Sequence, residues 1–300
     1  MSAIKSMLTP RLARQSNSAW IAACFPLPFP LRIQSQVAVI TGLKAALVAI
    51  VLCWRCLDPT TAFAGELTVA AAADLSPVLQ SITRNFQRET GNTVRLSFGS
   101  SGDFCNQIQN GAPYDVFLSA DRGYPEKLVK LGLADSDSLR TYAVGRLVLW
   151  VPNNSHLDMD HKGMQALLDR SVRKIAIANP QHAPYGRAAI AALHLYRLYD
   201  QIADRLVLGE NVGQAAQFAE SGNAQVGIIA LAHALAPSVR SLGRYWIVPA
   251  DSYPALEQGA VILSKSKNKT LGAQFLKYLA GSESQAIFRQ FGFVAPGEAH

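Results

Sequence analysis

The sequence predicts an α/β fold with two lobes. From residue 66 onward, short apolar runs typical of buried strands alternate with longer segments whose apolar residues recur every three or four positions. The alternation comes in two cycles, which long apolar segments join. The length of 300 residues also exceeds what one hydrophobic core usually serves. This pattern is typical of sheets covered by helices, and we expect parallel strands.

The first cycle begins with residues 67–73, an unbroken apolar run that predicts a buried strand. In the next segment, residues 75–91, apolar side chains recur at helical spacing and Gly91 ends the helix. The same two patterns predict further strands and helices along this part of the chain. The strands are expected at residues 93–100 and 114–120, and the helices at residues 103–111 and 125–133.

A long apolar segment, residues 142–152, leads from the first cycle into the second. The second cycle has strands at 174–180 and 225–231, helices at 185–199 and 213–222, further strands at 244–250 and 258–266, and final helices at 269–281 and 283–292. We place lobe one at residues 65–143 plus 252–300 and lobe two at residues 144–251. A hinge would join them, and ligands of such sheets bind beyond the carboxyl ends of the strands, here in an interlobe cleft.

Residues 1–64 predict a signal peptide. Lys44 precedes the apolar run 45–54, and Ala62-Phe63-Ala64 closes the segment, as in a cleavable export signal. The run has about ten residues, fewer than the roughly 20 of a membrane-spanning helix, so an uncleaved anchor is the weaker alternative. The proline-rich stretch before residue 37 is unusual in a signal. We therefore expect an over-extended N-terminus and a mature protein in the periplasm.

The charge of the chain argues against nucleic-acid binding. The chain has 28 Lys and Arg against 21 Asp and Glu, but six of these basic residues and only one acid lie in residues 1–64. The remaining chain is within two charges of neutrality and contains no basic run with interleaved aromatic residues. A protein that binds the phosphate backbone needs such a basic surface.

The motifs of common enzymes are missing after residue 64. There is no phosphate-binding loop, and GSSGD at residues 99–103 lacks the spacing of a nucleophile elbow. No two histidines lie four residues apart and Cys105 is the one cysteine of this part, so we expect no direct protein–metal ligands. A secreted hydrolase built from Ser100, His182 and Asp115 is an alternative, because such side chains can meet in space.

Four strand-to-helix corners carry small or hydroxyl residues. They lie at residues 74–76, 100–103, 179–189 and 210–216. Helix N-termini present N–H groups and about half a positive charge, and hydroxyls add further donors. Each corner alone is explained as an ordinary helix cap. Four of them, two in each predicted lobe and at equivalent strand ends, indicate a site for an oxyanion.

Residues 66–296 resemble the periplasmic molybdate-binding proteins of ABC importers. The most specific stretches are FGSSGDFCNQIQNGAPYDVFLSAD, IANPQHAPYGRAA, ENVGQAAQFAESGNAQVGIIAL and the terminal FGF. The resemblance implies the type II periplasmic binding protein fold, with two α/β lobes, a hinge and an interlobe cleft. It also implies a binding protein without enzymatic activity or cofactor, which holds a tetrahedral oxyanion by neutral hydrogen bonds.

The resemblance implies particular residues for this site. Backbone N–H groups of four residues would bind the oxyanion, and two further residues would take secondary parts. The four are Asp74, Ser101, Tyr185 and Val212, and the secondary residues are Ala73 and Ser100. A tyrosine found in part of the family falls on Ala230, and we expect the hydroxyl of Tyr185 to replace it.

Asp74 departs from the family pattern, in which serine, threonine or asparagine is frequent. A carboxylate about 4 Å from a dianion such as molybdate would cost about 1–4 kcal/mol, depending on the local dielectric. We expect the Asp74 side chain to cap its own helix through the amide of Ser76 or Val78, which leaves only its N–H for the ligand. Alternatively, Asp74 accepts a hydrogen bond from a protonated anion such as hydrogen phosphate.

Together these inferences predict an exported, monomeric protein that captures molybdate, and also tungstate, and delivers it to a membrane permease with its ATPase. One alternative is the same fold with another ligand, such as phosphate or a small organic acid. The secreted hydrolase is a second. The effector region of a transcription regulator is a third, but it needs an N-terminal helix-turn-helix where residues 1–64 offer a signal-like segment.

Overall fold

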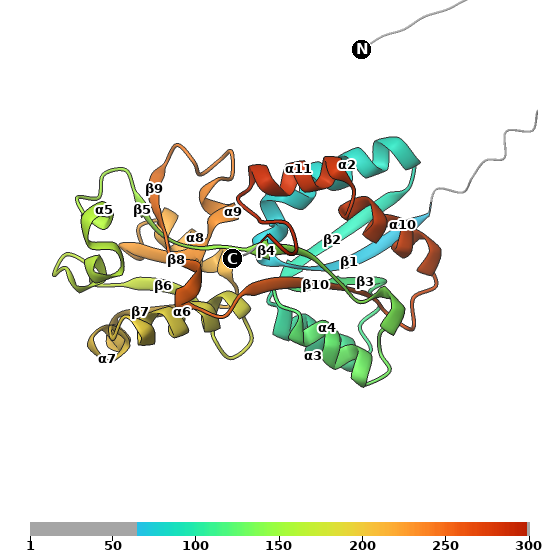
Figure 1. Ribbon diagram of the computed structural model, residues 1–300, viewed down its shortest axis with the longest axis horizontal. Helices are drawn as coiled ribbons and strands as arrows, with labels where there is room; N and C mark the ends of the chain where they lie inside the picture. The colour runs from blue at the N-terminus through green and yellow to red at the C-terminus, as the bar shows by residue number, and fades with distance from the viewer. Residues whose placement is uncertain (1–64, 299–300) are drawn as a thin grey trace, which may run out of the picture. The chain divides into compact units, whose positions relative to one another are not determined.

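The computed structural model describes residues 65–298 (Figure 1). The predicted signal peptide, residues 1–64, lies outside the described residues. The described chain forms two five-stranded sheets with helices packed on them, so the predicted α/β class is confirmed. Among these residues, no helix is both long and apolar enough to cross a membrane.

The first sheet has the strand order β2-β1-β3-β10-β4 and, with its helices, is called lobe one below. Its strands are β1 (Glu66–Ala72), β2 (Thr93–Gly99), β3 (Val116–Leu118), β4 (Arg140–Gly145) and β10 (Leu256–Ile262). Its helices are η1 (Ala73–Leu75), α2 (Ser76–Thr90), α3 (Ser101–Gln109), α4 (Gly123–Lys130), η2 (Ser136–Ser138), α10 (Lys269–Leu279) and α11 (Ser282–Gln290). Helix α2 buries the apolar face that its sequence pattern predicts, including Val78, Ile82 and Phe86.

The second sheet has the order β7-β6-β8-β5-β9 and forms lobe two with its helices. Its strands are β5 (Leu147–Pro152), β6 (Ile175–Ala178), β7 (Leu206–Gly209), β8 (Val226–Ala230) and β9 (Gly243–Ile247). Its helices are α5 (Met159–Lys162), η3 (Gly163–Leu168), α6 (Pro184–Leu195), α7 (Tyr199–Ile202), η4 (Ala203–Arg205), α8 (Val212–Glu220) and α9 (Leu231–Ala234). The sequence pattern missed β7, an edge strand whose Leu208 is exposed.

The expectation of parallel sheets is wrong for part of each sheet. Strand β1 pairs in parallel with β2 and β3, and β6 pairs in parallel with β7 and β8. Strand β10, however, is antiparallel to both β3 and β4, and β5 is antiparallel to both β8 and β9. These antiparallel strands are next to the two places where the chain passes from one sheet to the other. A strand that enters from the other lobe has no crossover helix to reverse its direction, which parallel pairing requires.

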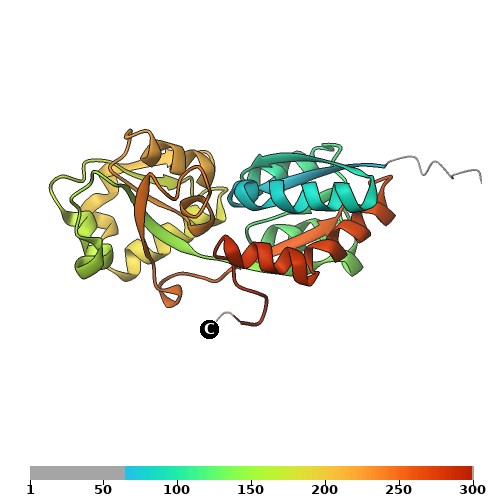
Figure 2. The ribbon, with the colours of Figure 1, turned by 90° about the horizontal axis from the view of Figure 1, so that it is seen from above.

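The chain passes between the sheets twice (Figure 2). The predicted long strand 142–152 is in fact two strands, because Arg146 separates β4 of the first sheet from β5 of the second. The return runs through residues 248–255, which include η5 (Ala250–Ser252). Hydrogen bonds join the two passages: the Leu147 N–H donates to the Tyr253 hydroxyl at 3.1 Å, and the Val248 N–H donates to the Leu147 carbonyl at 3.0 Å. The exact lobe boundaries given above stay predictions.

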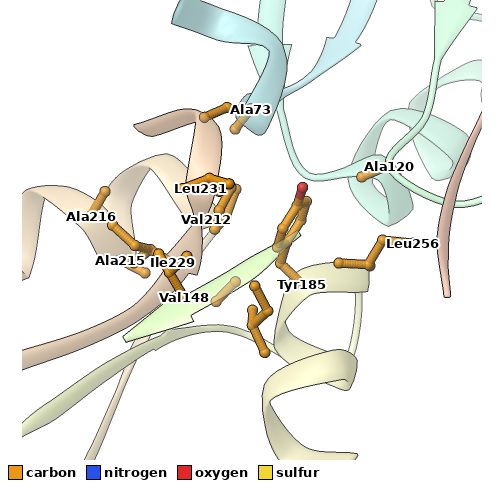
Figure 3. Close-up of a cluster of buried hydrophobic side chains, with 14 of the residues drawn as sticks. Ala73, Ala120, Val148, Tyr185, Val212, Ala215, Ala216, Ile229, Leu231 and Leu256 are labelled. Atoms are coloured by element: carbon orange, nitrogen blue, oxygen red, sulfur yellow. The ribbon is translucent and has the colours of Figure 1, made fainter. Parts of the chain in front are cut away.

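Small residues allow helices to begin directly at strand ends in both lobes. In lobe one, Ala72 ends β1 and Ala73 starts η1. In lobe two, a Cβ atom on Gly186 would lie 2.2 Å from the carbonyl oxygen of Ala178, so only glycine lets the first turn of α6 rest on the end of β6. Figure 3 shows Tyr185 on α6 together with alanines and branched apolar residues of the same buried cluster. This close packing fixes where the N-termini of the helices lie.

Candidate functional site

A small pocket lies where strand ends of both lobes meet. Its lining consists of Ala72, Ala73, Asp74, Gly99, Ser100, Ser101, Ala120, Ala183, Pro184, Tyr185, Asn211 and Val212. The structure therefore brings together all six residues that the sequence singled out. Within this described lining there is no Lys, Arg or His, and Asp74 is the one ionisable carboxylate. An anion here would have to be held by dipoles and hydrogen bonds.

Helix N-termini supply the donors of the pocket. Ser101 is the first residue of α3 and Val212 the first of α8, while Tyr185 follows Pro184 at the start of α6. The first N–H groups of a helix have no partner within the helix, and the helix dipole places partial positive charge beside them. Asn211 caps α8 by accepting from the N–H of Gln214 at 3.1 Å, which leaves the earlier N–H groups of that helix for a ligand.

The two adjacent serines use their hydroxyls differently. The Ser100 hydroxyl donates to the carbonyl oxygen of His182 at 2.7 Å, so its single hydrogen is already used. The Ser101 hydroxyl accepts from the N–H of Ala120 at 3.0 Å. Its own hydrogen is therefore left to donate into the pocket. The geometry therefore leaves the Ser101 hydroxyl hydrogen available, whereas Ser100 links lobe one to lobe two.

Tyr185 brings a hydroxyl from α6 into the pocket. Figure 3 shows the ring standing on α6 with the oxygen pointing toward the side where Ala73 and Ala120 lie. The side chain is buried, and its hydroxyl has no hydrogen-bond partner among the described residues. Gly145 makes room for it, because a Cβ atom there would lie 2.2 Å from the hydroxyl oxygen. Ala230 is not part of the pocket lining; it is buried at the end of β8.

The prediction that Asp74 caps its own helix is wrong. Neither η1 nor α2 has a side-chain cap, and one carboxylate oxygen of Asp74, Oδ2, instead accepts a hydrogen bond from the side-chain amide of Gln258 on β10. The amide oxygen of Gln258 in turn accepts from the Tyr142 hydroxyl at 2.8 Å, and that hydroxyl also lies 3.2 Å from the Ser119 carbonyl. The sheet rather than the helix therefore orients Asp74. The other carboxylate oxygen, Oδ1, is buried and has no partner among the described residues.

Burial dominates the electrostatics around Asp74. It raises the pKa of this carboxyl from 3.8 to about 6, against the opposing effects of the Gln258 hydrogen bond and of the nearby Tyr185 hydroxyl. Burial and the charge of Asp74 also raise the pKa values of Tyr185 and Tyr142 well above the ordinary 10. Both tyrosines are therefore neutral donors at physiological pH. The Asp74 carboxyl, by contrast, titrates close to the pH at which the protein would work.

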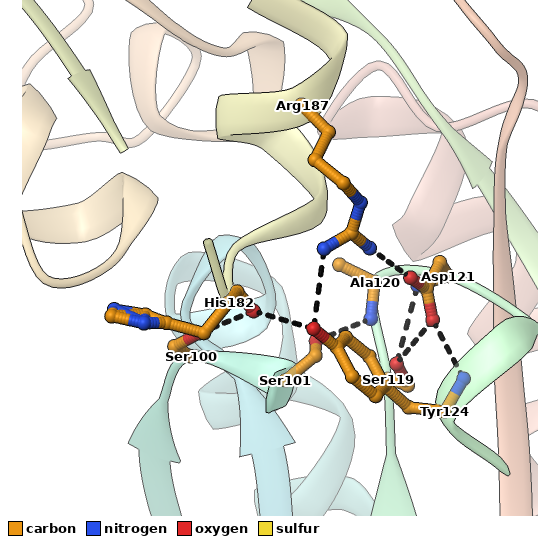
Figure 4. A network of polar contacts seen from close by, with 8 residues as sticks. All are labelled: Ser100, Ser101, Ser119, Ala120, Asp121, Tyr124, His182 and Arg187. Atoms are coloured by element: carbon orange, nitrogen blue, oxygen red, sulfur yellow. Dashed lines mark hydrogen bonds and ion pairs between the residues drawn. The ribbon is translucent and has the colours of Figure 1, made fainter. Parts of the chain in front are cut away.

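A second set of contacts joins the lobes beside the pocket (Figure 4). The carbonyl of His182 in lobe two accepts from the N–H of Gly102 at 2.9 Å and from the Tyr124 hydroxyl at 3.3 Å, in addition to Ser100. Arg187 on α6 pairs with Asp121 and donates to the Tyr124 hydroxyl at 3.2 Å. We call these residues the interlobe latch. They hold α3 and α6 together, so that the helix N-termini of both lobes face one pocket.

The hydrolase alternative has no assembled catalytic group. Ser100 contacts the backbone carbonyl of His182 rather than its ring, and the ring lies 3.6 Å from Asp103. Asp115 accepts hydrogen bonds from Thr68 and Ser266 and is not part of the pocket lining. In the described part of the chain, no three His, Cys, Asp or Glu side chains are placed to hold a metal ion.

Sequence reasoning missed the residues that orient Asp74. Gln258 and Tyr142 lie on β10 and β4, far from Asp74 in the chain. The available signal was a glutamine at the start of the apolar run QGAVIL, a place where burial is expected and where a polar side chain then needs a partner. The sequence could indicate that Gln258 has a polar partner, but it could not indicate which one.

Comparison with known proteins identifies related chains. The family model described as bacterial extracellular solute-binding protein matches residues 67–294. The chain is 39% identical over 231 residues to the molybdate-binding protein ModA of Azotobacter vinelandii, which covers 77% of this chain and 90% of that protein. It is also 39% identical over 233 residues to ModA of Rhodobacter capsulatus, covering 78% of this chain and 90% of that protein.

A solved structure shows the same architecture. The periplasmic molybdate-binding protein of Azotobacter vinelandii superposes with a TM-score of 0.73 at 38% sequence identity, and the match covers 77% of this chain and 99% of that one. The sulfate-binding protein SubI of Mycobacterium tuberculosis superposes with a TM-score of 0.64 at 16% identity, covering 78% of this chain and 88% of that one. At that identity the second likeness concerns the fold alone.

Proposed function

This chain belongs to the bacterial extracellular solute-binding proteins, and from that premise we propose that it captures molybdate in the pocket between its lobes. The chain is thus a binding protein rather than an enzyme, and it acts outside the cytoplasm. The observation that supports an oxyanion as the ligand is the convergence of helix N-termini from both lobes on a pocket whose lining has no cationic side chain. Identity of 39% to two molybdate-binding proteins supports the same ligand.

The donors of the pocket suit a tetrahedral oxyanion. N–H groups at Ser101, Tyr185 and Val212 would each face one oxygen, and the hydroxyls of Ser101 and Tyr185 would add two more donors. The charge would be spread over these neutral dipoles, and no counter-ion or cofactor is needed. Tungstate has the same charge and shape and nearly the same size, so the pocket would accept it as well. Sulfate is smaller, and donors held in a fixed arrangement reach it poorly.

Ligand binding would be coupled to closure of the lobes. Because donors come from both lobes, the anion stabilises the arrangement in which α3, α6 and α8 point at one centre. The interlobe latch supports the same arrangement. The closed form would deliver its anion to a permease with its ATPase, as implied by a relative in Bacillus subtilis that is described as a putative ABC transporter substrate-binding lipoprotein. We expect a monomer in the periplasm, exported by the segment 1–64.

Phosphate is the second candidate ligand, and Asp74 is the observation that favours it. Hydrogen phosphate carries a proton at neutral pH and could donate it to a carboxylate in the pocket, whereas molybdate is a bare dianion. The Oδ1 atom of Asp74 is buried without a partner among the described residues, which is what such a donor would require. The two ligands therefore differ in a way that a binding experiment can resolve.

Isothermal titration at pH 7.5 with molybdate, tungstate, sulfate and phosphate tests the proposal. We expect tight binding of the first two anions and none of the others. Ser101→Ala should weaken molybdate binding about tenfold, since a hydrogen bond to a charged partner contributes about 1.5 kcal/mol or more. Ser241→Ala, at an exposed position outside the pocket, is the matched control. Binding heat with phosphate alone would favour phosphate as the ligand. Absence of binding heat with all four anions would refute the proposal that the pocket binds an oxyanion.

A further inference from the structure

Two polar atoms in the pocket are buried without a hydrogen-bond partner among the described residues. They are Oδ1 of Asp74 and the hydroxyl oxygen of Tyr185, which come from opposite lobes. Buried polar groups in folded proteins nearly always have partners. Two such groups in one pocket therefore indicate that both are positioned for a ligand. A hydroxyl suits an anion, but an ionised carboxylate offers only acceptors and repels it.

The carboxyl group of Asp74 cannot easily turn away from the pocket. Its Oδ2 atom is held by the Gln258 amide, which is itself held by the Tyr142 hydroxyl. All three side chains are buried. With Oδ2 fixed in this way, Oδ1 is the atom left to meet whatever occupies the pocket.

Nothing around Asp74 offers a compensating positive charge. Its neighbours from α6, β4 and β10 are Tyr185, Tyr142 and Gln258, all uncharged. Four elements pack against η1. Strand β2 carries Arg95, which pairs with Glu66 at an exposed position. Helix α2 carries Arg84, α8 carries Glu220 and α9 carries His233; these three line an adjacent groove with Ala73, and none has a hydrogen bond to Asp74 in the described structure. His233 is kept neutral by burial, which lowers its pKa to about 4.

We propose that this site takes up a proton from solvent with each oxyanion it binds, and that the proton lies on Oδ1 of Asp74, where it bridges the carboxyl to an anion oxygen. The inference rests on the proposed function and deepens it. The step forms one O–H bond on the carboxylate and breaks none in the anion, while water or buffer supplies the proton. Asp74 then becomes a donor, like the serine, threonine or asparagine that a neutral pocket would use.

In this proposal the hydroxyl of Tyr185 has two roles, which depend on the protonation state of Asp74. With Asp74 ionised, that hydroxyl lies near enough to stabilise the charge, in addition to the Gln258 amide. With Asp74 protonated, it is released to donate to the anion. Burial already raises the pKa of Asp74 to about 6, and a dianion beside it raises the pKa further. At pH 7.5 the carboxyl is mostly ionised without ligand, so protonation on binding is measurable as net uptake.

The test is a calorimetric count of protons. Molybdate is titrated into the protein at pH 7.5 in two buffers of different ionisation enthalpy, neither of them an oxyanion. The dependence of the observed heat on that enthalpy should give uptake of about one proton per anion. Asp74→Asn, a neutral isostere, should bind with an uptake near zero. Asp204→Asn, at an exposed site on η4 outside the pocket lining, should behave as the unmodified protein does.

The pH profile gives an independent readout. Affinity of the unmodified protein should fall about tenfold for each pH unit above 7, while Asp74→Asn stays flat and binds more tightly than the parent at pH 8.5. Tyr185→Phe should bind more weakly but still take up the proton. Equal uptake and equal slopes in the parent and Asp74→Asn would overturn the proposal although molybdate binds. Absence of molybdate binding by both would instead overturn the proposed function, and this inference with it.

Discussion

At the scale of single residues, Asp74 has an effect on stability as well as on binding. Its folded-state pKa of about 6 lies above the unfolded value of 3.8, so the native state holds the proton more tightly. The contribution of Asp74 to the free energy of unfolding is therefore largest below pH 3.8. It decreases as the pH rises toward 6 and stays low above that pH. This decrease in the free energy of unfolding amounts to about 3 kcal/mol, at about 1.4 kcal/mol per unit of pKa difference.

We accordingly expect Asp74→Asn to raise the free energy of unfolding at pH 7.5 by up to about 3 kcal/mol, because the isostere keeps an acceptor for Gln258 and removes the buried charge. Urea unfolding of the ligand-free protein, followed by circular dichroism, measures this. Asp204→Asn is the exposed control and should change little. A loss of stability in Asp74→Asn would mean that the carboxylate is well solvated or paired, contrary to the geometry.

His233 has the opposite pH dependence. Burial lowers its pKa from 6.5 to about 4, and its Nδ1 atom has no partner among the described residues. As the pH falls, the unfolded chain takes up this proton before the folded protein does. The contribution of His233 to the free energy of unfolding is therefore complete above pH 6.5 and is lost as the pH falls toward 4. The loss amounts to about 3 kcal/mol. Between pH 4 and 6 it largely cancels the gain from Asp74.

His233→Gln should therefore remove acid sensitivity, although the substitution itself costs some packing energy. We expect its stability to increase as the pH falls from 6 to 4, while that of the unmodified protein changes little. Urea unfolding at several pH values between 4 and 7 gives the two curves. His194→Gln, at an exposed position on α6, provides the control. Parallel curves for His233→Gln and the parent would contradict the assignment.

At the scale of elements, α3 and α6 meet because Gly102 has no side chain. A Cβ atom on Gly102 would lie 2.6 Å from the Cβ of His182 and 2.7 Å from its carbonyl oxygen, both in the other lobe. The same glycine donates its N–H to that carbonyl. The position is helical, so alanine is compatible with the backbone of α3 itself. The Tyr124 hydroxyl of lobe one would also lie 2.6 Å from this Cβ atom, but it is the end of a side chain that can move, whereas the His182 backbone cannot. Most of the cost would therefore fall on lobe closure.

We therefore expect Gly102→Ala to weaken molybdate binding at least tenfold while the thermal midpoint of the ligand-free protein changes little. Isothermal titration measures the first quantity and differential scanning calorimetry the second. Gly123→Ala at the start of α4, where no neighbouring atom lies closer than 4.0 Å, is the matched control. Unchanged affinity in Gly102→Ala would show that the interlobe latch is not needed for binding.

The hydrophobic periodicity of the sequence predicted most helices and strands, and the errors of this prediction have physical causes. The buried strands β1 and β8 and the helices α2 and α6 have strong periodicity and were found. Strand β7 was missed because an edge strand with an exposed Leu208 lacks the apolar run of a central strand. The segment 142–152 was taken as one strand because Arg146 is a single residue between two apolar runs. Nothing local shows that these runs belong to different sheets.

At the scale of the whole molecule, the two passages between the lobes explain the architecture. Each sheet has parallel strands at one side, where helices reverse the chain, and antiparallel strands at the other, where the chain arrives from the other lobe. Backbone hydrogen bonds of Leu147 join both passages, so that a bend in one involves the other. The N-termini of α3, α6 and α8 reach one pocket because equivalent strand ends of two sheets face each other.

The sequence by itself determined the α/β class and the strand-to-helix corners, because local periodicity and small residues at strand ends carry that information. The six candidate residues that the pocket unites followed from the resemblance to a known family. It also showed that Asp74 is unusual. Only the tertiary structure decided what Asp74 does, since its partner Gln258 is 184 residues away and arrives on a strand that has passed through the other lobe. Contacts at such separation depend on sheet order and direction, which short-range patterns do not specify.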